Sequence, residues 1–305
     1  MGPGTVRAPA GGWHAVGVPR FVHAAPGITL WAQTVAGPAT DPVFLVADAG
    51  ASLALWPEPL IAALAAHHPV ICYDHRDTGR SRASPVADGV ADETAYGVAT
   101  LAADAVAVLD AYDVARAHLL GWGMGGLVAQ LLLLDHAHRF ASATLLATRP
   151  LPAPGAPVLP APPTALRRLW AELDDPRDAE GELDWRVAHD RLLHGAELPF
   201  DAAAFRARHE RATAHAGTVE PVTAHTHLTV PARGAELALV AVPTLVVEAP
   251  TDPVYPPPAA AVLADALGRA RLLGIPGLGH VFGDTTAVRL AETIVDHTMS
   301  IPTSA

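Results

Sequence analysis

The chain has 305 residues, half of them apolar, which suffices for one large α/β domain with an insertion. Its formal net charge is −11, and every basic residue is an arginine. This acidity argues against a nucleic-acid partner and against anionic membrane surfaces. No apolar run approaches the roughly 20 residues of a membrane span, and the N-terminus lacks the apolar segment of a signal peptide.

The single cysteine, Cys72, lies in the apolar stretch Val70–Tyr73, which is typical of a buried strand. A lone cysteine excludes a disulfide within the chain and fits a reducing compartment, so we expect a cytoplasmic protein. A thiol in such surroundings is expected to be inert.

The first half of the chain alternates predicted strands and helices after a Gly/Pro/Ala-rich segment, residues 1–19, that we expect to be a loose tail. Such alternation predicts a mostly parallel sheet covered by helices on both faces. Two strands flank a Pro-Gly turn, which favours an antiparallel hairpin. The predicted strands are Arg20–His23, Ile28–Ala32, Val43–Ala47, Val70–Tyr73, a strand ending near Trp122, and Ala143–Ala147; the helices are Glu58–Ala66, Ala95–Tyr112 and one reaching Leu134.

The pattern changes after the sixth strand. Residues 151–163 are proline-rich and should be extended. Amphipathic helices are predicted from Thr164 and from Asp201, the second ending near Gly217. We therefore expect a helical cap over residues 151–231, inserted into a core formed by residues 20–150 and 232–300. The core resumes with strands at 243–249 and 271–275 and helices at 256–267 and 288–297.

The stretch Leu119–Ala129 carries the strongest motif. An apolar strand runs into Gly121-Trp122-Gly123-Met124-Gly125 and then into a helix. This is the strand–turn–helix of a nucleophile elbow, G-x-S-x-G, with Gly123 where the serine would stand. The elbow holds its central residue in a strained conformation that costs a non-glycine residue on the order of 1–3 kcal/mol, and glycine avoids most of that cost.

Asp252 and His280 follow the next two strands, in the order acid then histidine that hydrolases of this topology use. Both stand just past the carboxyl ends of strands, where open α/β sheets bind ligands. The aspartate would orient the imidazole and the histidine would move the proton. Alternatively, Asp252 starts a turn before Pro253 and His280 is one surface histidine among 16.

An oxyanion hole would need the backbone N–H of Met124 and, from the loop after the third strand, that of Ala49. Asp48 is unusual there, because its carboxylate lies beside a place that receives negative charge; its alternative role is to cap the following turn. Water held by His280, a ligand or a side chain such as Trp122 could occupy the space above Gly123. Trp170 and Trp185 in the cap are further candidate substrate contacts or simply packing residues.

Gly121, Gly123 and Gly126 also match the dinucleotide motif G-x-G-x-x-G. The acidic residue that should follow the next strand is absent, and Thr148-Arg149-Pro150 stands there instead. We interpret the match as accidental, with NADP binding through Arg149 as the remaining alternative, and expect neither cofactor nor metal.

Several segments together resemble the α/β-hydrolase fold family, and most closely its aclacinomycin methylesterase group, which trims methyl esters from anthracycline polyketides. The resemblance implies His280 and Asp252 as base and acid and Met124 with Ala49 as oxyanion donors, but supplies no nucleophile at Gly123. The matching segments are Leu53–Pro57, Tyr73–Ser81, Leu101–Asp110, the elbow, His215–Gly217 and Pro276–His280.

Three functional hypotheses follow. The first is an enzyme acting on a hydrophobic small molecule, of polyketide type, by His280/Asp252 general-base and oxyanion-hole chemistry without an acyl-enzyme: cyclisation, elimination, decarboxylation or water-mediated hydrolysis. The second is a non-catalytic ligand-binding protein. The third is an ordinary carboxyl or methyl esterase that carries a serine-to-glycine change. The sequence predicts no oligomeric state.

Overall fold

The computed structural model describes residues 17, 19–83, 96–218, 225 and 227–301. The expected tail at residues 1–19, apart from 17 and 19, and parts of the expected cap lie outside this range. In the described part, nine strands form one sheet in the order β1-β2-β4-β3-β6-β7-β8-β9, with β5 paired to β2. The strands are β1 (Arg20–Ala25), β2 (Ile28–Val35), β3 (Val43–Val46), β4 (Val70–Tyr73), β5 (Arg82–Ala83), β6 (Ala117–Trp122), β7 (Phe140–Leu146), β8 (Thr244–Glu248) and β9 (Arg271–Gly274).

Strands β3, β4, β6, β7, β8 and β9 are mutually parallel, whereas β1 and β2 form the expected antiparallel hairpin at one edge. The two-residue strand β5 was not predicted, because two residues carry no periodicity. The expected mostly parallel α/β sheet is therefore confirmed, with the insertion following β7.

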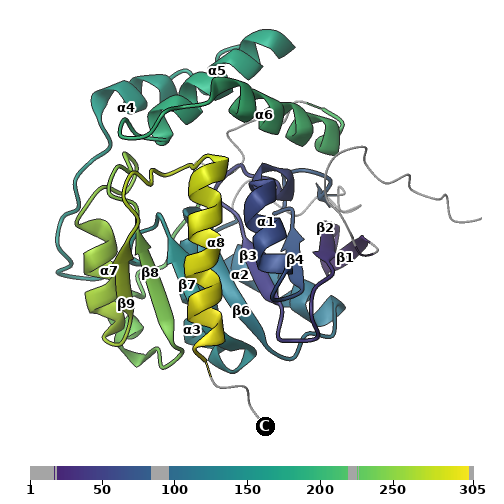
Figure 1. The fold of residues 1–305 in the computed structure, drawn as a ribbon, viewed down its shortest axis with the longest axis vertical. Helices are drawn as coiled ribbons and strands as arrows, with labels where there is room; N and C mark the ends of the chain where they lie inside the picture. Colours follow the sequence, from purple (N-terminus) through teal and green to yellow (C-terminus); the bar gives the residue numbers. More distant parts are fainter. Residues whose placement is uncertain (1–16, 18, 84–95, 219–224, 226, 302–305) are drawn as a thin grey trace, which may run out of the picture.

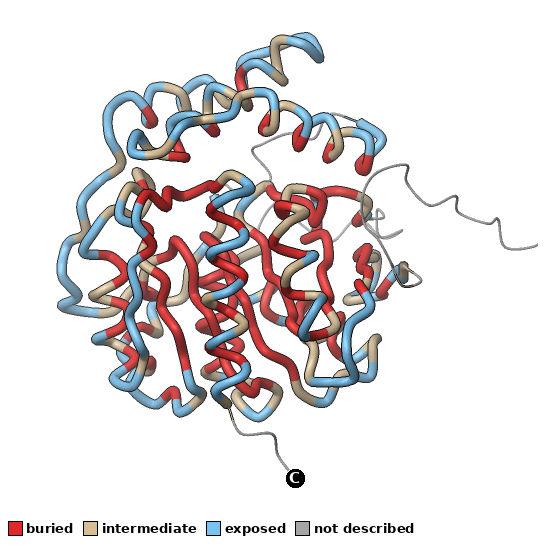
Figure 2. The backbone as a smooth tube through the Cα atoms, viewed as in Figure 1, coloured by how far each residue is buried: buried red, intermediate tan, exposed pale blue. Residues whose placement is uncertain are grey.

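Helices cover both faces of the sheet (Figure 1). On one face lie α1 (Glu58–Ala65) and α8 (Asp284–Met299); on the other lie α2 (Val98–Ala111), α3 (Met124–Asp135) and α7 (Ala259–Leu267). Alternate strand residues enter the two cores: Phe44 packs with α2 and α3, and Leu45 packs with α1 and α8. Figure 2 shows the central strands buried along their length, which explains their continuous apolar sequences.

Three helices lie over the carboxyl ends of the parallel strands (Figure 1): α4 (Thr164–Trp170), α5 (Ala179–Leu193) and α6 (Ala202–Ala216). The start of α4 and both ends of α6 agree with the sequence. Asp201 caps α6 by accepting from Ala204 N, and Gly217 ends it with a φ of 79°.

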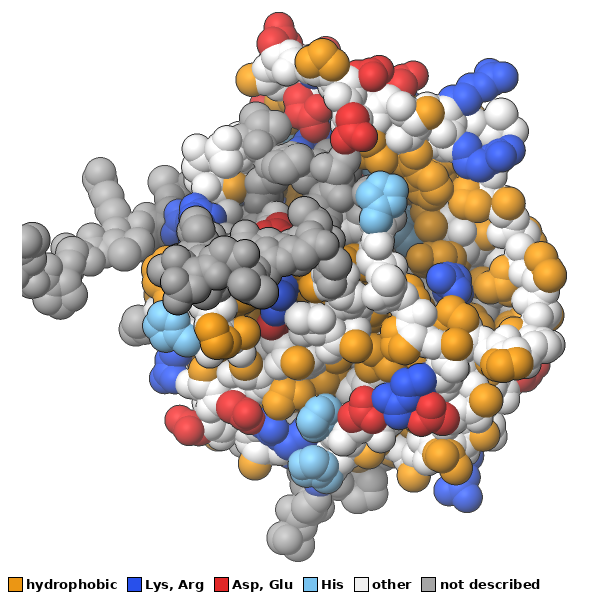
Figure 3. All heavy atoms as spheres, turned by 180° about the vertical axis from the view of Figure 1, so that it is seen from behind, with side chains coloured by type: hydrophobic (Ala, Val, Ile, Leu, Met, Phe, Trp, Pro, Cys, Tyr) orange, Lys and Arg blue, Asp and Glu red, His pale blue; other side chains and the backbone are white. Residues whose placement is uncertain are grey.

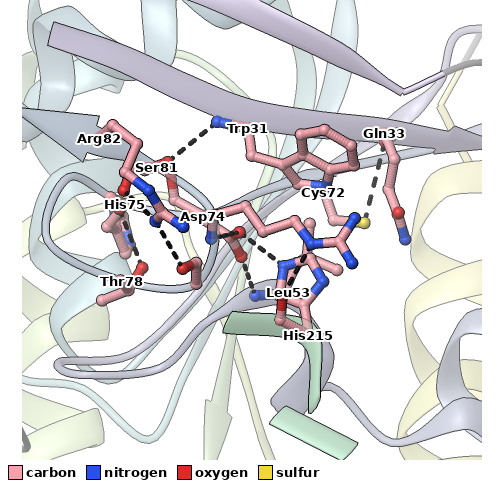
Figure 4. Close-up of polar contacts among 12 residues, drawn as sticks. Trp31, Gln33, Leu53, Cys72, Asp74, His75, Thr78, Ser81, Arg82 and His215 are labelled. Carbon is pink, nitrogen blue, oxygen red and sulfur yellow. Dashed lines mark hydrogen bonds and ion pairs between the residues drawn. The ribbon is translucent and has the colours of Figure 1, made fainter. Parts of the chain in front are cut away.

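The layer formed by α4, α5 and α6 is tied to the sheet by a buried carboxylate, Asp74, just after β4 (Figure 4). Its Oδ2 lies 2.7 Å from His215 Nε2 on α6, and its Oδ1 accepts from Leu53 N at 2.8 Å. Arg80 donates from Nε to the His215 carbonyl at 2.7 Å. These bonds fix α6 over the sheet edge that carries the candidate site.

No helix in the described ranges is both long and apolar enough to cross a membrane.

Candidate active site

The elbow forms where β6 meets α3. Gly123 has φ 57° and ψ −118°, a conformation that side chains rarely adopt, and its N–H donates to the Leu146 carbonyl at 3.0 Å. Met124 begins α3, so its N–H is one of the free donors at the helix N-terminus. The turn thus presents a backbone donor at the carboxyl edge of the sheet.

Asp252 lies in the loop after β8, and its side chain is fully buried. Its Oδ1 accepts from the N–H groups of Val254 at 2.7 Å and Tyr255 at 3.0 Å. Its Oδ2 lies 2.9 Å from His280 Nδ1. The two predicted residues, 28 positions apart, therefore meet in a hydrogen bond.

The backbone of His280 is held on both sides. Its N–H donates to the Leu193 carbonyl at the end of α5 (2.8 Å), and its carbonyl accepts from Trp122 Nε1 (2.7 Å). The buried Trp122 ring also packs on Trp56 and Phe282. Trp122 therefore fixes the histidine from the sheet side, and α5 fixes it from above.

Asp48 occupies the position above Gly123. Its Oδ1 accepts from Met124 N at 2.7 Å, and its Oδ2 lies 2.9 Å from His280 Nε2. The Ala49 N–H also acts on this carboxylate and helps to lower its pKa. Both N–H groups predicted to form an oxyanion hole thus face a carboxylate of the protein itself, and the side chain above the glycine is Asp48 rather than Trp122.

Gly123 is what makes room for this carboxylate. A Cβ atom placed on Gly123 would overlap Oδ1 and Cγ of Asp48. A serine at 123 and the observed position of Asp48 therefore exclude each other.

His280 lies between two carboxylates. An ionised carboxylate can only accept hydrogen bonds, so both ring nitrogens of His280 donate and the ring is an imidazolium. Burial acts to lower the pKa of His280, but the charges of Asp252 and Asp48 and their hydrogen bonds outweigh it and raise the pKa to about 10.

Asp48 shows the reciprocal effect. Burial acts to raise its pKa, but the charge of His280, the bond to His280 and the N–H groups of Met124 and Ala49 together hold it below its ordinary value. Near neutral pH the site is therefore a carboxylate–imidazolium pair backed by Asp252. A resting His280 of this kind is a proton donor rather than a free base.

The pair faces a cavity of about 410 Å³ between the sheet edge and the helical layer, within the size range of small-molecule sites. Its walls are mainly apolar, and a second hollow of about 470 Å³ adjoins it beside residues 149–162. Figure 3, which views the molecule from behind, shows hydrophobic side chains gathered on the side where this connecting segment runs. The residues lining the 410 Å³ cavity include Asp48, Ala49, Met124, Leu127, Arg149, Trp170, His189, Leu193, Val254, Tyr255 and His280.

The profile of the alpha/beta hydrolase fold matches residues 41–285. The chain belongs to the α/β hydrolase fold family. It is 37% identical over 288 residues to rhodomycin D methylesterase DnrP of Streptomyces peucetius, covering 89% of this chain and 95% of that protein. The same values hold for rhodomycin D methylesterase DauP of Streptomyces sp. strain C5.

Solved structures share the hydrolase fold. The esterase RhEst1 from Rhodococcus sp. ECU1013 superposes with a TM-score of 0.75 at 22% identity, covering 93% of this chain and 99% of that one. At this identity the likeness concerns the fold alone. The sequence resemblance to a methylesterase group of the α/β hydrolases is supported by the similarity to the two rhodomycin D methylesterases.

The three predicted tryptophans differ in position within the hydrolase fold. Trp170 lines the 410 Å³ cavity. Trp122 and Trp185 instead line a smaller hollow of about 90 Å³ next to Asp48. Trp122 also holds the His280 carbonyl, so its contact with the site is through the backbone of the histidine.

Three polar residues that line the cavity were not considered in the sequence, namely His189, His225 and Tyr255, and a fourth, Arg149, was weighed only for NADP binding. His189 lies on α5, which the sequence did not delimit because its polar residues obscure the apolar face. Burial lowers the pKa of His189 to about 4, and its Nε2 accepts from Trp170 Nε1 at 2.9 Å. Tyr255 follows Asp252 by three residues, and its ring packs edge-on against His280.

Within the described residues of this α/β hydrolase, no group of three or more His, Cys, Asp or Glu side chains has the arrangement of a metal site.

Proposed function

We propose that this protein is an enzyme that transfers protons on a hydrophobic, polyketide-type small molecule and forms no acyl-enzyme. The observation that carries the proposal is the Asp48 carboxylate, which bridges Met124 N–H and His280 Nε2 at the floor of the 410 Å³ cavity. Gly123 stands where hydrolases of this fold carry their nucleophilic serine, and Asp48 takes the hydrogen bond that a serine would make with the histidine. The similarity to rhodomycin D methylesterases supports a polycyclic substrate.

The mechanism uses Asp48 as proton acceptor and His280 as proton donor. Asp48 takes a proton from an acidic C–H or O–H group of the substrate, and the His280 imidazolium donates its Nε2 proton to the oxygen that becomes negative. Asp48 then returns its proton to His280, which restores the pair. Asp252 holds the ring through Nδ1 and stabilises its charge throughout.

The shifted pKa values tune this exchange. Each group shifts the other, so a substrate oxygen that enters between them brings the two pKa values closer together and eases proton transfer. Because the resting Asp48 is a weak base, the reaction suits activated protons, such as those of phenols and 1,3-dicarbonyl groups. Cyclisation, elimination, decarboxylation and water-mediated hydrolysis all begin or end with such a step.

The test incubates the protein in D₂O with rhodomycin D and, separately, with the free acid obtained from it by ester hydrolysis. Mass spectrometry follows deuterium uptake, loss of CO₂ or water, and conversion of the ester to the acid. We expect solvent deuterium in the product, abolished in Asp48→Asn and His280→Gln and retained in Asp265→Asn, an exposed carboxylate on α7. Conversion that is unaffected by Asp48→Asn would overturn the proposal, as would binding of both compounds with no conversion.

A further inference from the structure

We infer that Arg149 is an anion-binding residue of the cavity and that the substrate carries a carboxylate or a similarly acidic group beside its reacting centre. The inference rests on the proposed function, because it names the chemistry of the molecule that fills the same cavity. Arg149 follows β7, at the carboxyl edge of the sheet where ligands bind in open α/β folds.

The backbone at Arg149 is fixed by the fully buried side chain of Gln130 on α3. Gln130 Nε2 donates to the Arg149 carbonyl at 2.9 Å, and Gln130 Oε1 accepts from Leu151 N at 2.8 Å. The same amide also donates to the Gly126 carbonyl in the first turn of α3. The arginine is thus anchored to the helix that begins at the elbow, which presets its position relative to the candidate site.

Within the described residues, no carboxylate lies within ion-pair distance of the Arg149 guanidinium. Its side chain lies beside Tyr255, whose ring centre is 6.0 Å from the guanidinium carbon. The arginine is only half-buried and lines both adjoining hollows. A guanidinium that faces an apolar cavity without a counterion is a natural receptor for a carboxylate, which it can hold with two parallel hydrogen bonds.

The other ionisable groups of the cavity do not offer a free positive charge to an anion, whereas Arg149 does. Asp48 is already paired with His280. Burial lowers the pKa values of His189 and His225 and raises that of Tyr255 to about 12, so these groups are neutral near pH 7. In a protein of net charge −11, a local cation is also what offsets the general repulsion of an anionic ligand.

Tyr255 links the arginine to the reacting pair. Its ring packs edge-on against His280 with 5.6 Å between ring centres, and its other neighbour is Arg149. Arg149 and His280 therefore both neighbour the Tyr255 ring, and all three line the same cavity. This spacing suits a polycyclic molecule whose acidic group is anchored while a neighbouring carbon or oxygen meets Asp48 and His280.

The experiment compares a hydroxyanthraquinone carboxylic acid with its methyl ester, by fluorescence titration of the whole protein. We expect the wild type to bind the acid about tenfold or more tightly than the ester, as a charge-assisted bidentate contact implies. Arg149→Met should weaken binding of the acid much more than binding of the ester and so remove this preference, whereas Arg149→Lys should keep part of it. Arg168→Met removes the same charge from an exposed position on α4 and should keep the preference.

Equal affinity of the wild type for acid and ester would overturn the inference, as would a preference that survives in Arg149→Met or failure of both compounds to bind. Failure of the proposed function is distinguished by Asp48→Asn. If that variant converts substrate normally, proton transfer by Asp48 is wrong, while the acid preference set by Arg149 is still measured directly by binding.

Discussion

Two loops of the protein hold an aspartate in the same way, and only one of them faces a cavity. In each loop a glycine with positive φ lets the carboxylate reach the N–H of the next residue, and the carboxylate also meets Nε2 of a distant histidine. One set is Gly123, Met124, Asp48 and His280; the other is Gly79, Arg80, Asp74 and His215, and Figure 4 shows the contact between Asp74 and His215.

The difference lies in access and in the second face of each histidine. The Asp74 side chain is fully buried, and both its oxygens are engaged by the protein. The Asp48 side chain is 17% exposed and lines the cavity, and its histidine has a second carboxylate, Asp252, behind it. The same local arrangement thus serves as a joint between α6 and the sheet in one place and as a reactive pair in the other.

The largest effect should come from removing the charge of each aspartate. We expect Asp48→Asn to lower turnover of the substrate by roughly 10²–10⁴-fold, the usual contribution of general acid–base catalysis, and to lower the Tm as well, because the charge of Asp48 helps to raise the pKa of His280 in the folded state. Asp74→Asn should leave the reacting pair in place and destabilise the fold by roughly 1–3 kcal/mol, because it disturbs the buried hydrogen bonds with Leu53 N, Arg80 N and His215 Nε2. Denaturant unfolding and the D₂O assay separate the two outcomes. A turnover loss in Asp74→Asn that equals that of Asp48→Asn would erase the distinction.

Alanine substitutions at Gly79 and Gly123 should give the next largest effects, and the two effects should differ. A Cβ at either position overlaps the facing carboxylate. In Gly79→Ala the buried Asp74 has no room to move, so we expect a loss of roughly 2–4 kcal/mol from strain and broken hydrogen bonds. In Gly123→Ala the Asp48 side chain can turn into the cavity, so stability should fall less while turnover is lost.

The midpoints of urea unfolding measure this contrast, with Gly155→Ala as control, since Gly155 also has positive φ but no atom within 4 Å of an added Cβ. Gly155→Ala reports the backbone strain alone. If Gly79→Ala were no less stable than Gly155→Ala, the contact with Asp74 would contribute nothing.

The sequence predicted the sheet and most of its helices because buried parallel strands have continuous apolar runs and surface helices have period 3.6. It also indicated Asp252 and His280, since both follow strand ends. The contact between Asp48 and His280 joins residues 232 positions apart and depends on side-chain direction, which no local pattern encodes. Asp48 was noticed only as a charge in an unusual place.

Arg149 illustrates the same limit. In the sequence it was weighed only as a phosphate-binding residue of a dinucleotide motif. Its cavity position follows from the path of the chain after β7 and from the Gln130 hydrogen bonds, both of which are tertiary features. Helix α5, with His189 and Trp185, was undefined for a related reason: a cap helix buries only part of its surface, so its apolar period is weak.

A smaller effect, a gain of esterase activity, should follow from placing a serine at position 123 and removing the Asp48 carboxylate. In Gly123→Ser/Asp48→Ala the carboxylate is removed, the hydroxyl has room, and the N–H groups of Met124 and Ala49 are free to hold an oxyanion. We expect slow hydrolysis of p-nitrophenyl acetate above the wild-type rate, and none in Gly123→Ser alone, where Asp48 competes for the space. Equal rates in the single and double variants would show that Asp48 does not block the elbow.

The pH dependence of stability and of turnover should give the smallest effect, but its direction is clearly defined. Since the folded-state pKa of His280 is raised from 6.5 to about 10, its charge contributes stability that is complete below pH 6.5 and is lost as pH rises through 10. Asp48 has a lowered pKa, so its contribution is present above its ordinary value of 3.8 and is lost as pH falls through the lowered value. Turnover by the ion pair should therefore decline as pH rises toward 10.

Asp48→Ala/Gly123→Ser removes one of the two carboxylates beside His280, which lowers the histidine pKa, and a serine needs the neutral ring as its base. The esterase rate of that double variant should therefore rise with pH through a midpoint below 10. A midpoint of variant hydrolysis clearly below that of the wild-type decline would identify Asp48 as a group that keeps His280 protonated, whereas equal midpoints near pH 10 would assign that role to Asp252 alone.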